Sequence, residues 1–212
     1  MTKSNSHSIN DFLAGNFQIS ILAQTKLPEM PMTSTQTTQL LPGRISKVPL
    51  WMALMLRQSG ACVISIPPFL QVNFLTNWLR NEEAAGEELL TGLPDLFFEV
   101  AYKMLAGCPE DFGGNNNTSN SNSNRISDGT ENDPSLSSSV GGVEGVRILV
   151  ESIRLCRQKK ISRRLLAVKE SLLSDKPIDM TGILALERCE IRPFASECLG
   201  LIKELQEDGL SR

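Results

Sequence analysis

The sequence predicts an α+β protein that is predominantly α-helical, with a small N-terminal β-rich domain followed by a helical-bundle domain that carries a long disordered loop. Near the N-terminus apolar residues alternate with polar ones, as in a half-buried strand, whereas most later apolar residues recur at helical spacing. One long stretch rich in Asn, Ser and Gly buries too little apolar surface to offset the entropy of ordering. We therefore divide the 212 residues into a disordered tail at 1–8, a β-rich domain at 9–47 and a helical domain at 48–212, interrupted by a disordered insert at 109–141.

The β-rich domain is predicted from Phe17, Ile19 and Ile21, which alternate with polar or small neighbours. Several prolines and Gly43 interrupt any helix in this segment. Such a segment accommodates only a few short strands, so it is too small to be an independent enzyme core.

The helical domain opens with Pro49, which suits the first position of a helix because its missing N–H would be unpaired there anyway. The run 49–56 is apolar on every face, so we expect this helix to be buried, with Trp51, Leu54 and Met55 in the chain's own core.

A short buried strand at 61–66 and helices near 69–79 and 94–107 follow, bounded by proline and glycine. The C-terminal part predicts a long helix from residue 143 to about Ser174 and two shorter helices, one at 183–189 and one from Pro193.

The long helix has two apolar rows separated by a step of five residues, so either the helix bends there or its halves face different partners. The rows are Val146, Leu149, Ile153 and Cys156, then Ile161, Leu165, Val168 and Leu172.

Few residues offer catalytic or metal chemistry. His7 is the only histidine and lies in the predicted tail, which argues against a Ser-His-Asp triad and an HExxH metal site. We find no GxxxxGK[ST] phosphate loop and no apolar run of about 18 residues, so we predict no cofactor, no metal and no membrane span. The cysteines lack the paired spacing of zinc sites or disulfide frameworks, so we expect reduced thiols: Cys62, Cys108, Cys156, Cys189 and Cys198.

A group of carboxylates remains as a candidate acid/base site. Two carboxylates become such a pair only when they are buried and spaced across a substrate. These lie in a polar stretch, which favours solvated helix ends: Glu82, Glu83, Glu87, Glu88, Asp95 and Glu99.

Basic residues collect on the long helix, where eight bases and three acids lie between residues 144 and 170. Arg154, Arg157, Lys160 and Arg164 follow one another at helical steps. Three readings stay open: a solvated or salt-bridged face, a partner-protein surface, or nucleic-acid contact, for which no stacking aromatic is present.

Several short motifs follow one another in a fixed order. Val48-Pro49-Leu50-Trp51 and the following Met52 to Gln58 resemble the VPLW-x-A-x-x-L-K-Q pattern of the Psf2 family of the GINS complex. A cysteine-containing strand and Pro67-Pro68 come next, and the stretch 181–194, which ends in Arg192-Pro193-Phe194, is similar to the family's second motif. Leu184 stands where the family has a capping Ser/Thr, so half of the capping box is lost although Glu187 remains.

The resemblance implies a small β-rich domain before a larger helical one, and a structural, non-catalytic role in a heterotetramer with three sister GINS subunits. It also implies a nuclear location and membership of the CMG replicative helicase with the MCM motor and Cdc45, in which other chains hydrolyse ATP. Direct DNA contact stays open. A free-standing helical adaptor unrelated to replication and a small enzyme using Glu87, Glu88 and Asp95 are the alternatives.

For contacts with partner subunits we predict two groups of residues, apolar and basic, on the long helix and the last helix. The apolar ones are Leu149, Ile153, Leu165, Leu172, Phe194 and Leu201, and the basic ones are Arg154, Arg157, Lys160 and Arg164. The family-motif residues Val48, Pro49, Leu50, Trp51, Arg192, Pro193 and Phe194 are assigned structural roles.

Overall fold

The structure is a computed structural model that describes residues 3–29, 39–113, 142–171 and 181–210, and within these it describes no side chains for 3–7, 166–171, 198–199 and 201–210. The predicted insert therefore lies outside the described residues except for 109–113. Those five residues form a short 3-10 helix, Pro109–Gly113.

The sheet has three antiparallel strands in the order β2-β1-β3. The central strand β1 (Gln18–Ala23) pairs with β2 (Ile45–Pro49) on one side and with β3 (Cys62–Ile64) on the other. Ile19 and Ile21 point into the core while Gln18 and Leu22 are exposed, so the predicted strand with one buried face is confirmed.

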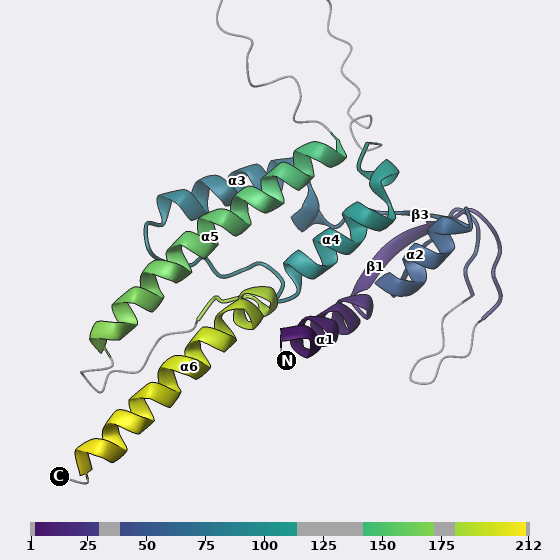
Figure 1. Ribbon diagram of the computed structural model, residues 1–212. Helices are drawn as coiled ribbons and strands as arrows, with labels where there is room; N and C mark the ends of the chain where they lie inside the picture. The colour runs from purple at the N-terminus through teal and green to yellow at the C-terminus, as the bar shows by residue number, and fades with distance from the viewer. Residues whose placement is uncertain (1–2, 30–38, 114–141, 172–180, 211–212) are drawn as a thin grey trace, which may run out of the picture.

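The rest of the described chain is mostly helical, as predicted. The α-helices are α1 (Lys3–Gly15), α2 (Leu50–Gln58), α3 (Val72–Ala84), α4 (Phe97–Gly107), α5 (Val143–Ser171) and α6 (Ala185–Leu210), with a 3-10 turn at Pro68–Leu70. Helices α3 and α5 lie side by side, α4 lies between α5 and the sheet, and α1 contacts α4 and the start of α6 (Figure 1).

One hydrophobic core connects the sheet with the helices. Ile21 and Ile64 of the sheet, Phe97 of α4 and Ile153 of α5 all belong to it and are almost fully buried. Strand β3 lies beyond the predicted boundary at residue 47, so both predicted domains contribute strands to one sheet. The division at 47 stays a prediction about domains, and the two segments share a core.

Besides the disorder predicted for residues 109–113, three sequence predictions are wrong. Residues 3–8, predicted as a disordered tail, are part of helix α1, and this helix includes His7. The two helices predicted at 183–189 and from Pro193 are one helix, α6, with Pro193 inside it. A proline inside a helix removes one backbone hydrogen bond but does not always end the helix.

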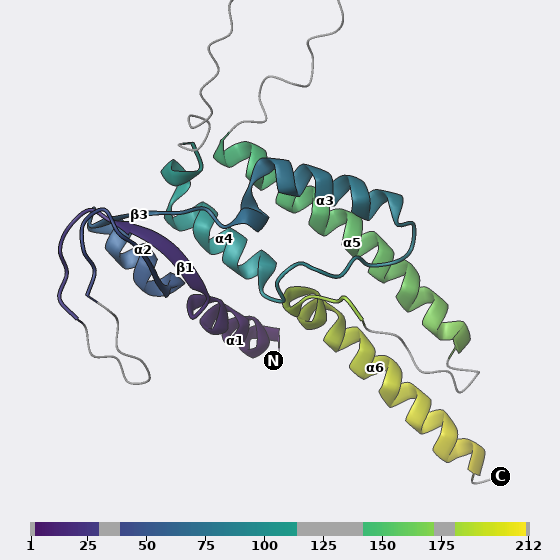
Figure 2. The same ribbon diagram turned by 180° about the vertical axis from the view of Figure 1, so that it is seen from behind.

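The third error concerns α2. Leu50, Met52 and Ala53 are buried, but Trp51 is 42% exposed and Met55 is 62% exposed. Only one side of α2 faces the sheet and α4, because the sheet is small and leaves the other side of the helix uncovered (Figure 2).

Candidate protein–protein interface

The predicted apolar contacts on α5 are buried, partly buried or outside the described residues. Leu149 and Ile153 are buried in the core of this chain, so neither side chain is free to contact a partner, and that prediction is wrong for both. Leu165 is partly buried against a small second cluster around Ile161. Leu172 lies outside the described residues, and Leu201 lies in a part of α6 whose side chains are not described.

The exposed apolar side chains of α5 are different residues. Ile148 is 57% exposed and Leu155 is 54% exposed. They are seven residues apart, so they lie on the same side of the helix. Ile148 and Leu149 are neighbours in the sequence. Apolar periodicity alone does not show which of two neighbouring apolar residues faces the core and which faces solvent.

The predicted basic residues of α5 include buried and partly exposed side chains. Arg157 is fully buried and Lys160 is 4% exposed, so neither is on a contact surface, contrary to the prediction. Arg154 is partly exposed and pairs with Glu190 and with Glu151.

Arg157 has a hydrogen-bond acceptor for each of its five N–H groups. Its Nε and Nη2 bond the two carboxylate oxygens of Glu187 at 2.7 and 2.9 Å. Nη1 bonds Oε2 of Glu82 at 3.4 Å and the carbonyl of Leu90 at 3.2 Å, and Nη2 also bonds the carbonyl of Gly182 at 2.6 Å. The guanidinium therefore joins α3, α5, α6 and two loops.

Lys160 completes this arrangement. Its ammonium donates to Oε1 of Glu82 at 3.0 Å, to the carbonyl of Glu88 at 2.8 Å, and to the backbone carbonyl of Glu82. We call Glu82, Arg157, Lys160 and Glu187 the buried ionic cluster. With two acids and two bases it has no net charge, so these side chains present no basic surface to nucleic acid. Glu82 was predicted to be solvated and is instead 0% exposed.

Glu187 also fixes the first turn of α6. Its Oε2 accepts a hydrogen bond from the backbone N–H of Leu184 at 2.8 Å, three residues earlier. This is the half of a capping box that a glutamate supplies, and it persists although Leu184 cannot supply the other half. The same carboxylate thus caps α6 and pairs with Arg157.

The other carboxylates of the predicted group do not form an acid/base pair. Glu83, Glu87, Glu88 and Asp95 are exposed, as predicted. Glu99 is the exception, because it is 6% exposed and burial raises the pKa of its carboxyl. Among the described residues, no group of three His, Cys, Asp or Glu side chains is placed to hold a metal ion.

The described thiols are free: Cys62, Cys108, Cys156 and Cys189. Burial raises the pKa of Cys108 to about 12 and also raises the pKa of Cys62. Both therefore stay protonated near neutral pH, where a nucleophilic cysteine needs to be a thiolate. Cys198 has no described side chain.

A surface on α1 and α2 was missed by the sequence reading. Ile9, Phe12 and Leu13 are 59%, 74% and 47% exposed and share one face of α1, at steps of three and four residues. Trp51 and Met55 are exposed on α2, and a Cβ at Gly15 would lie 3.8 Å from that of Trp51, so the end of α1 abuts α2. We call these five residues the α1–α2 apolar surface.

The second family-like motif lies at a groove between α1 and α6. Phe194 is 50% exposed and Arg192 is exposed. The groove has a volume of about 470 Å³, and its lining includes Ile9, Ile191 and Ala195. Val48 and Leu50 of the first motif are buried, whereas Trp51 of the same motif is exposed.

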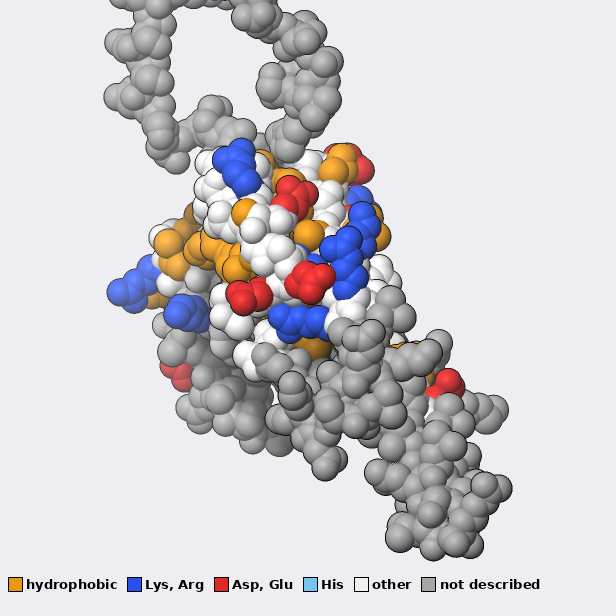
Figure 3. All heavy atoms as spheres, turned by 90° about the vertical axis from the view of Figure 1, so that its left-hand side faces the viewer, with side chains coloured by type: hydrophobic (Ala, Val, Ile, Leu, Met, Phe, Trp, Pro, Cys, Tyr) orange, Lys and Arg blue, Asp and Glu red, His pale blue; other side chains and the backbone are white. Residues whose placement is uncertain are grey.

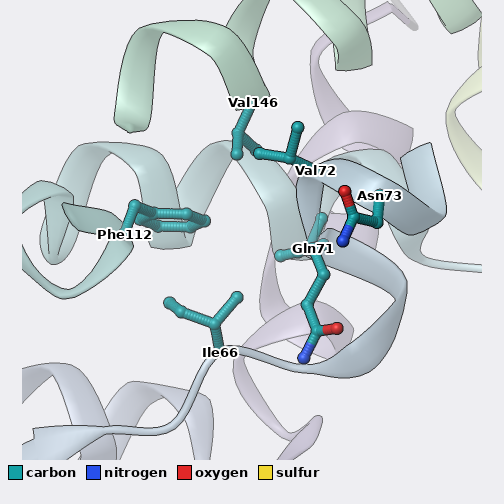
Figure 4. Close-up of a pocket in the computed structure, with 7 residues that line it drawn as sticks. Ile66, Gln71, Val72, Asn73, Phe112 and Val146 are labelled. Carbon is teal, nitrogen blue, oxygen red and sulfur yellow. The ribbon is translucent and has the colours of Figure 1, made fainter. Parts of the chain in front are cut away.

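A second cavity has no ionisable side chain among the described residues that line it. Its lining includes Ile66, Phe112 and Val146, and the polar atoms come from the amides of Gln71 and Asn73 (Figure 4). At about 180 Å³ it is also small for a substrate site.

Charge on the visible surface is mixed. On the face that lies at the left of Figure 1, basic and acidic side chains lie next to one another, with hydrophobic side chains exposed beside them (Figure 3). No helix among the described residues has the length and hydrophobicity to cross a membrane.

Comparison with known proteins shows what the chain is similar to. Residues 6–65 match the model of the PSF2 N-terminal domain. The protein named DNA replication complex GINS protein psf2 of Schizosaccharomyces pombe is 27% identical over 195 residues, which cover 92% of this chain and 87% of the relative. The chain is thus similar to Psf2 proteins over most of its length.

Two other Psf2 proteins match over different lengths. DNA replication complex GINS protein PSF2 of Candida albicans is 26% identical over 92% of this chain and 80% of its own length. The probable PSF2 protein of Encephalitozoon cuniculi is 30% identical over 90 residues, which cover 42% of this chain and 51% of the relative. The Psf2 domain match runs from α1 through β3, so it contains all three strands of the sheet.

Proposed function

We propose that this chain is a non-catalytic structural subunit of the heterotetrameric GINS complex, with a role in DNA replication. The observation that carries the proposal is the match to proteins named as GINS subunits over 92% of the chain, from both the β-rich and the helical part. The finer proposal is that it assembles with three sister subunits in the nucleus and supports the CMG helicase, in which it meets the MCM motor and Cdc45.

The exposed apolar residues support a role in assembly. The α1–α2 apolar surface, Ile148 and Leu155 on α5, and Phe194 on α6 leave large apolar side chains in water. Obligate interfaces bury on the order of 2,000 Å² or more with apolar centres, so such residues are the natural contacts for sister subunits. Arg154, Arg164 and Leu165 remain predicted contacts.

A structural role is also supported by the chemistry of the buried polar groups. The buried ionic cluster satisfies its own donors and joins α3, α5 and α6, so it stabilises the fold and leaves no free acid or base. The enzyme alternative used Glu87, Glu88 and Asp95, which are exposed, whereas an acid/base pair needs burial to shift its pKa values.

Co-expression with the three sister subunits tests the proposal. We expect the four chains to purify together in equal amounts through size exclusion, and the mass of the particle to equal the sum of the four. A chain that is monomeric, fully folded and unbound when the sisters are present would refute the proposal and favour the free-standing adaptor.

A further inference from the structure

The outer edge of β2 offers backbone hydrogen-bonding groups that no other described strand uses. β2 is an edge strand, because the sheet has the order β2-β1-β3. The backbone N–H of Ala23 donates to the carbonyl of Arg44 at 3.4 Å, and hydrogen-bonded pairs alternate with non-bonded pairs along an antiparallel ladder. Every second residue of β2, counted from Arg44, therefore faces β1. Ile45 and Lys47 lie between these residues, so their N–H and C=O groups point away from the sheet.

The opposite edge of the sheet is closed by a side chain. The backbone N–H of Ile64 on β3 donates to Oδ2 of Asp111 at 3.1 Å. Arg57 holds this carboxylate through its Nε, which lies 2.9 and 3.0 Å from the two oxygens. Unpaired backbone groups on an exposed strand edge are a template for pairing with another chain, so proteins blunt or cover such edges. Within the described residues, the edge of β3 is covered in this way and the edge of β2 is not.

An apolar row on the solvent side of the sheet ends at this open edge. Leu22 of β1 pairs with Ile45 on β2 and with Val63 on β3, and directly paired residues share one face of a sheet. Leu22 is 41% exposed, Ile45 is 73% exposed and Val63 is partly buried. The neighbouring Ile21 is buried in the core, so the row lies on the opposite, outer face. An added strand would cover the end of this row.

The charge around β2 favours an acidic partner. Arg44 and Lys47 are exposed, and no acidic side chain of the described residues forms an ion pair with either. The segments 17–29 and 39–49 contain one acid, Glu29, and one further base, Lys26, so three bases against one acid leave a net positive charge. Complementary charge speeds association and suppresses wrong partners, so a binding segment should be acidic.

A second copy of this chain fits the edge poorly. Pairing of two β2 strands would bring Arg44 and Lys47 of both chains together, so four bases would lie close to one another without an acid. The edge is also short, because Pro49 has no N–H and α2 begins at the next residue. A short extended segment with an acidic side chain fits this edge better than a second sheet does.

We propose that the open edge of β2 binds a short extended segment of another protein as an additional strand. The backbone groups of Ile45 and Lys47 bind the segment, an apolar side chain lies opposite Ile45, and an acidic side chain two residues away lies opposite Lys47. The inference goes beyond the proposed function, because it follows from the geometry of this chain and needs no sister subunit.

The probe is a capped, fluorescently labelled peptide, Thr-Asp-Thr-Val-Thr-Asp-Thr, which has the required spacing in both chain directions. We expect saturable binding to the purified full-length chain, with a dissociation constant below about 1 mM. Residue-resolved amide hydrogen exchange gives the position of the peptide. The amides of Ile45 and Lys47 should exchange quickly in the free chain and become protected by the peptide, whereas those of Ser46 and Val48 already face β1 and should change little.

Two variants of β2 test the two parts of the contact. Ile45→Pro removes an N–H at the open edge but no bond to β1, so it should raise the dissociation constant about tenfold or more. Lys47→Glu should weaken binding of this peptide as much, and it should bind instead a peptide in which lysine replaces both aspartates. Lys159→Glu on α5 makes the same change of charge at an exposed position outside the sheet, so it is the control and should bind like the wild type.

The proposal is supported if both β2 variants keep the thermal midpoint of the wild type and lose the peptide. It is overturned by an absence of saturable binding, by binding that neither variant weakens, or by binding that leaves the amides of Ile45 and Lys47 unprotected. A wild-type dimer that Ile45→Pro dissociates would also overturn it, because a second copy would then occupy the edge. The measurement involves no sister subunit, so its failure is distinguishable from a failure of the proposed function.

Discussion

Replacing Arg157 by methionine is the sharpest test of how this fold is held together. Methionine has a similar length but no donors, so the variant leaves the carboxylates of Glu187 and Glu82 with Lys160 as the one remaining base of the buried ionic cluster. Five hydrogen bonds are lost, and one buried negative charge is left uncompensated.

The expected cost is large because burial prevents water from replacing the guanidinium. Breaking a buried ion pair by removing one partner costs about 3–5 kcal/mol. In a chain of this size 1 kcal/mol shifts the thermal midpoint by about 2–4 °C, so we expect a decrease of about 6–20 °C. Circular dichroism on heating and urea titration of the purified full-length chain, alone or in its complex, measure this.

The matched control is Arg154→Met on the same helix, one turn earlier. Arg154 pairs with Glu190, and both side chains are about one-third exposed. Exposed pairs contribute about 0–1 kcal/mol, so this variant should change the midpoint by only a few degrees. If Arg157→Met were as stable as the wild type, or no less stable than Arg154→Met, the buried ionic cluster would not be the element that holds α3, α5 and α6 together.

Three other predictions address the surface, the thiols and one turn. Met55→Ala should lower the free energy of unfolding by less than about 1 kcal/mol but weaken assembly in a pull-down with the sister subunits, whereas Met52→Ala in the same helix should cost about 2–5 kcal/mol in urea titration, because Met52 is 3% exposed. Burial raises the pKa of Cys108 to about 12, so this thiol should react with a thiol reagent at pH 8 only after unfolding. Because the folded state favours the neutral thiol, the contribution of Cys108 to stability is present below its unfolded pKa near 9 and is lost as the pH rises toward 12. Gly182→Ala should lower the thermal midpoint, because Gly182 has a φ of 83° and a Cβ there would lie 3.3 Å from the carbonyl oxygen of Leu89; an unchanged midpoint would show that this turn tolerates a side chain.

The regular elements were predictable from the sequence because periodicity reports directly on burial. Ile19 and Ile21 alternate as a strand requires, and the strand and helices that follow lie close to their predicted positions. Periodicity fails where the neighbours decide. Trp51 and Met55 look like core residues in an apolar run, but the three-stranded sheet and α4 cover only one side of α2, and no local pattern reports how far a sheet extends.

The candidate contact residues were harder to predict, because the local sequence does not show which basic residues have acidic partners from distant parts of the chain. Arg157 and Lys160 lie in a basic stretch, which favours a solvated face. Their counter-ions come from residues 75 and 30 positions away for Arg157, and 78 positions away for Lys160. No residue near Arg157 in the sequence indicates that Glu82 or Glu187 lies beside it in the fold. The burial of this arginine therefore depends on tertiary packing that composition does not encode.

One signal in the sequence did point to the buried ionic cluster. The two apolar rows of α5 are separated by a step of five residues, which favoured either a bend or two partners. Ile153, Arg157 and Ile161 are four residues apart, and α5 is continuous over 143–171, so the buried side of the helix runs directly through the arginine. A buried face that includes a charged residue requires acids from other elements, and here those acids are Glu82 on α3 and Glu187 on the first turn of α6. Glu187 bonds Arg157 through both carboxylate oxygens and also caps α6, so these hydrogen bonds set the direction of α6 relative to α5. A purely apolar contact would not specify that direction as closely. The position of the exposed Phe194 on α6 depends on it as well.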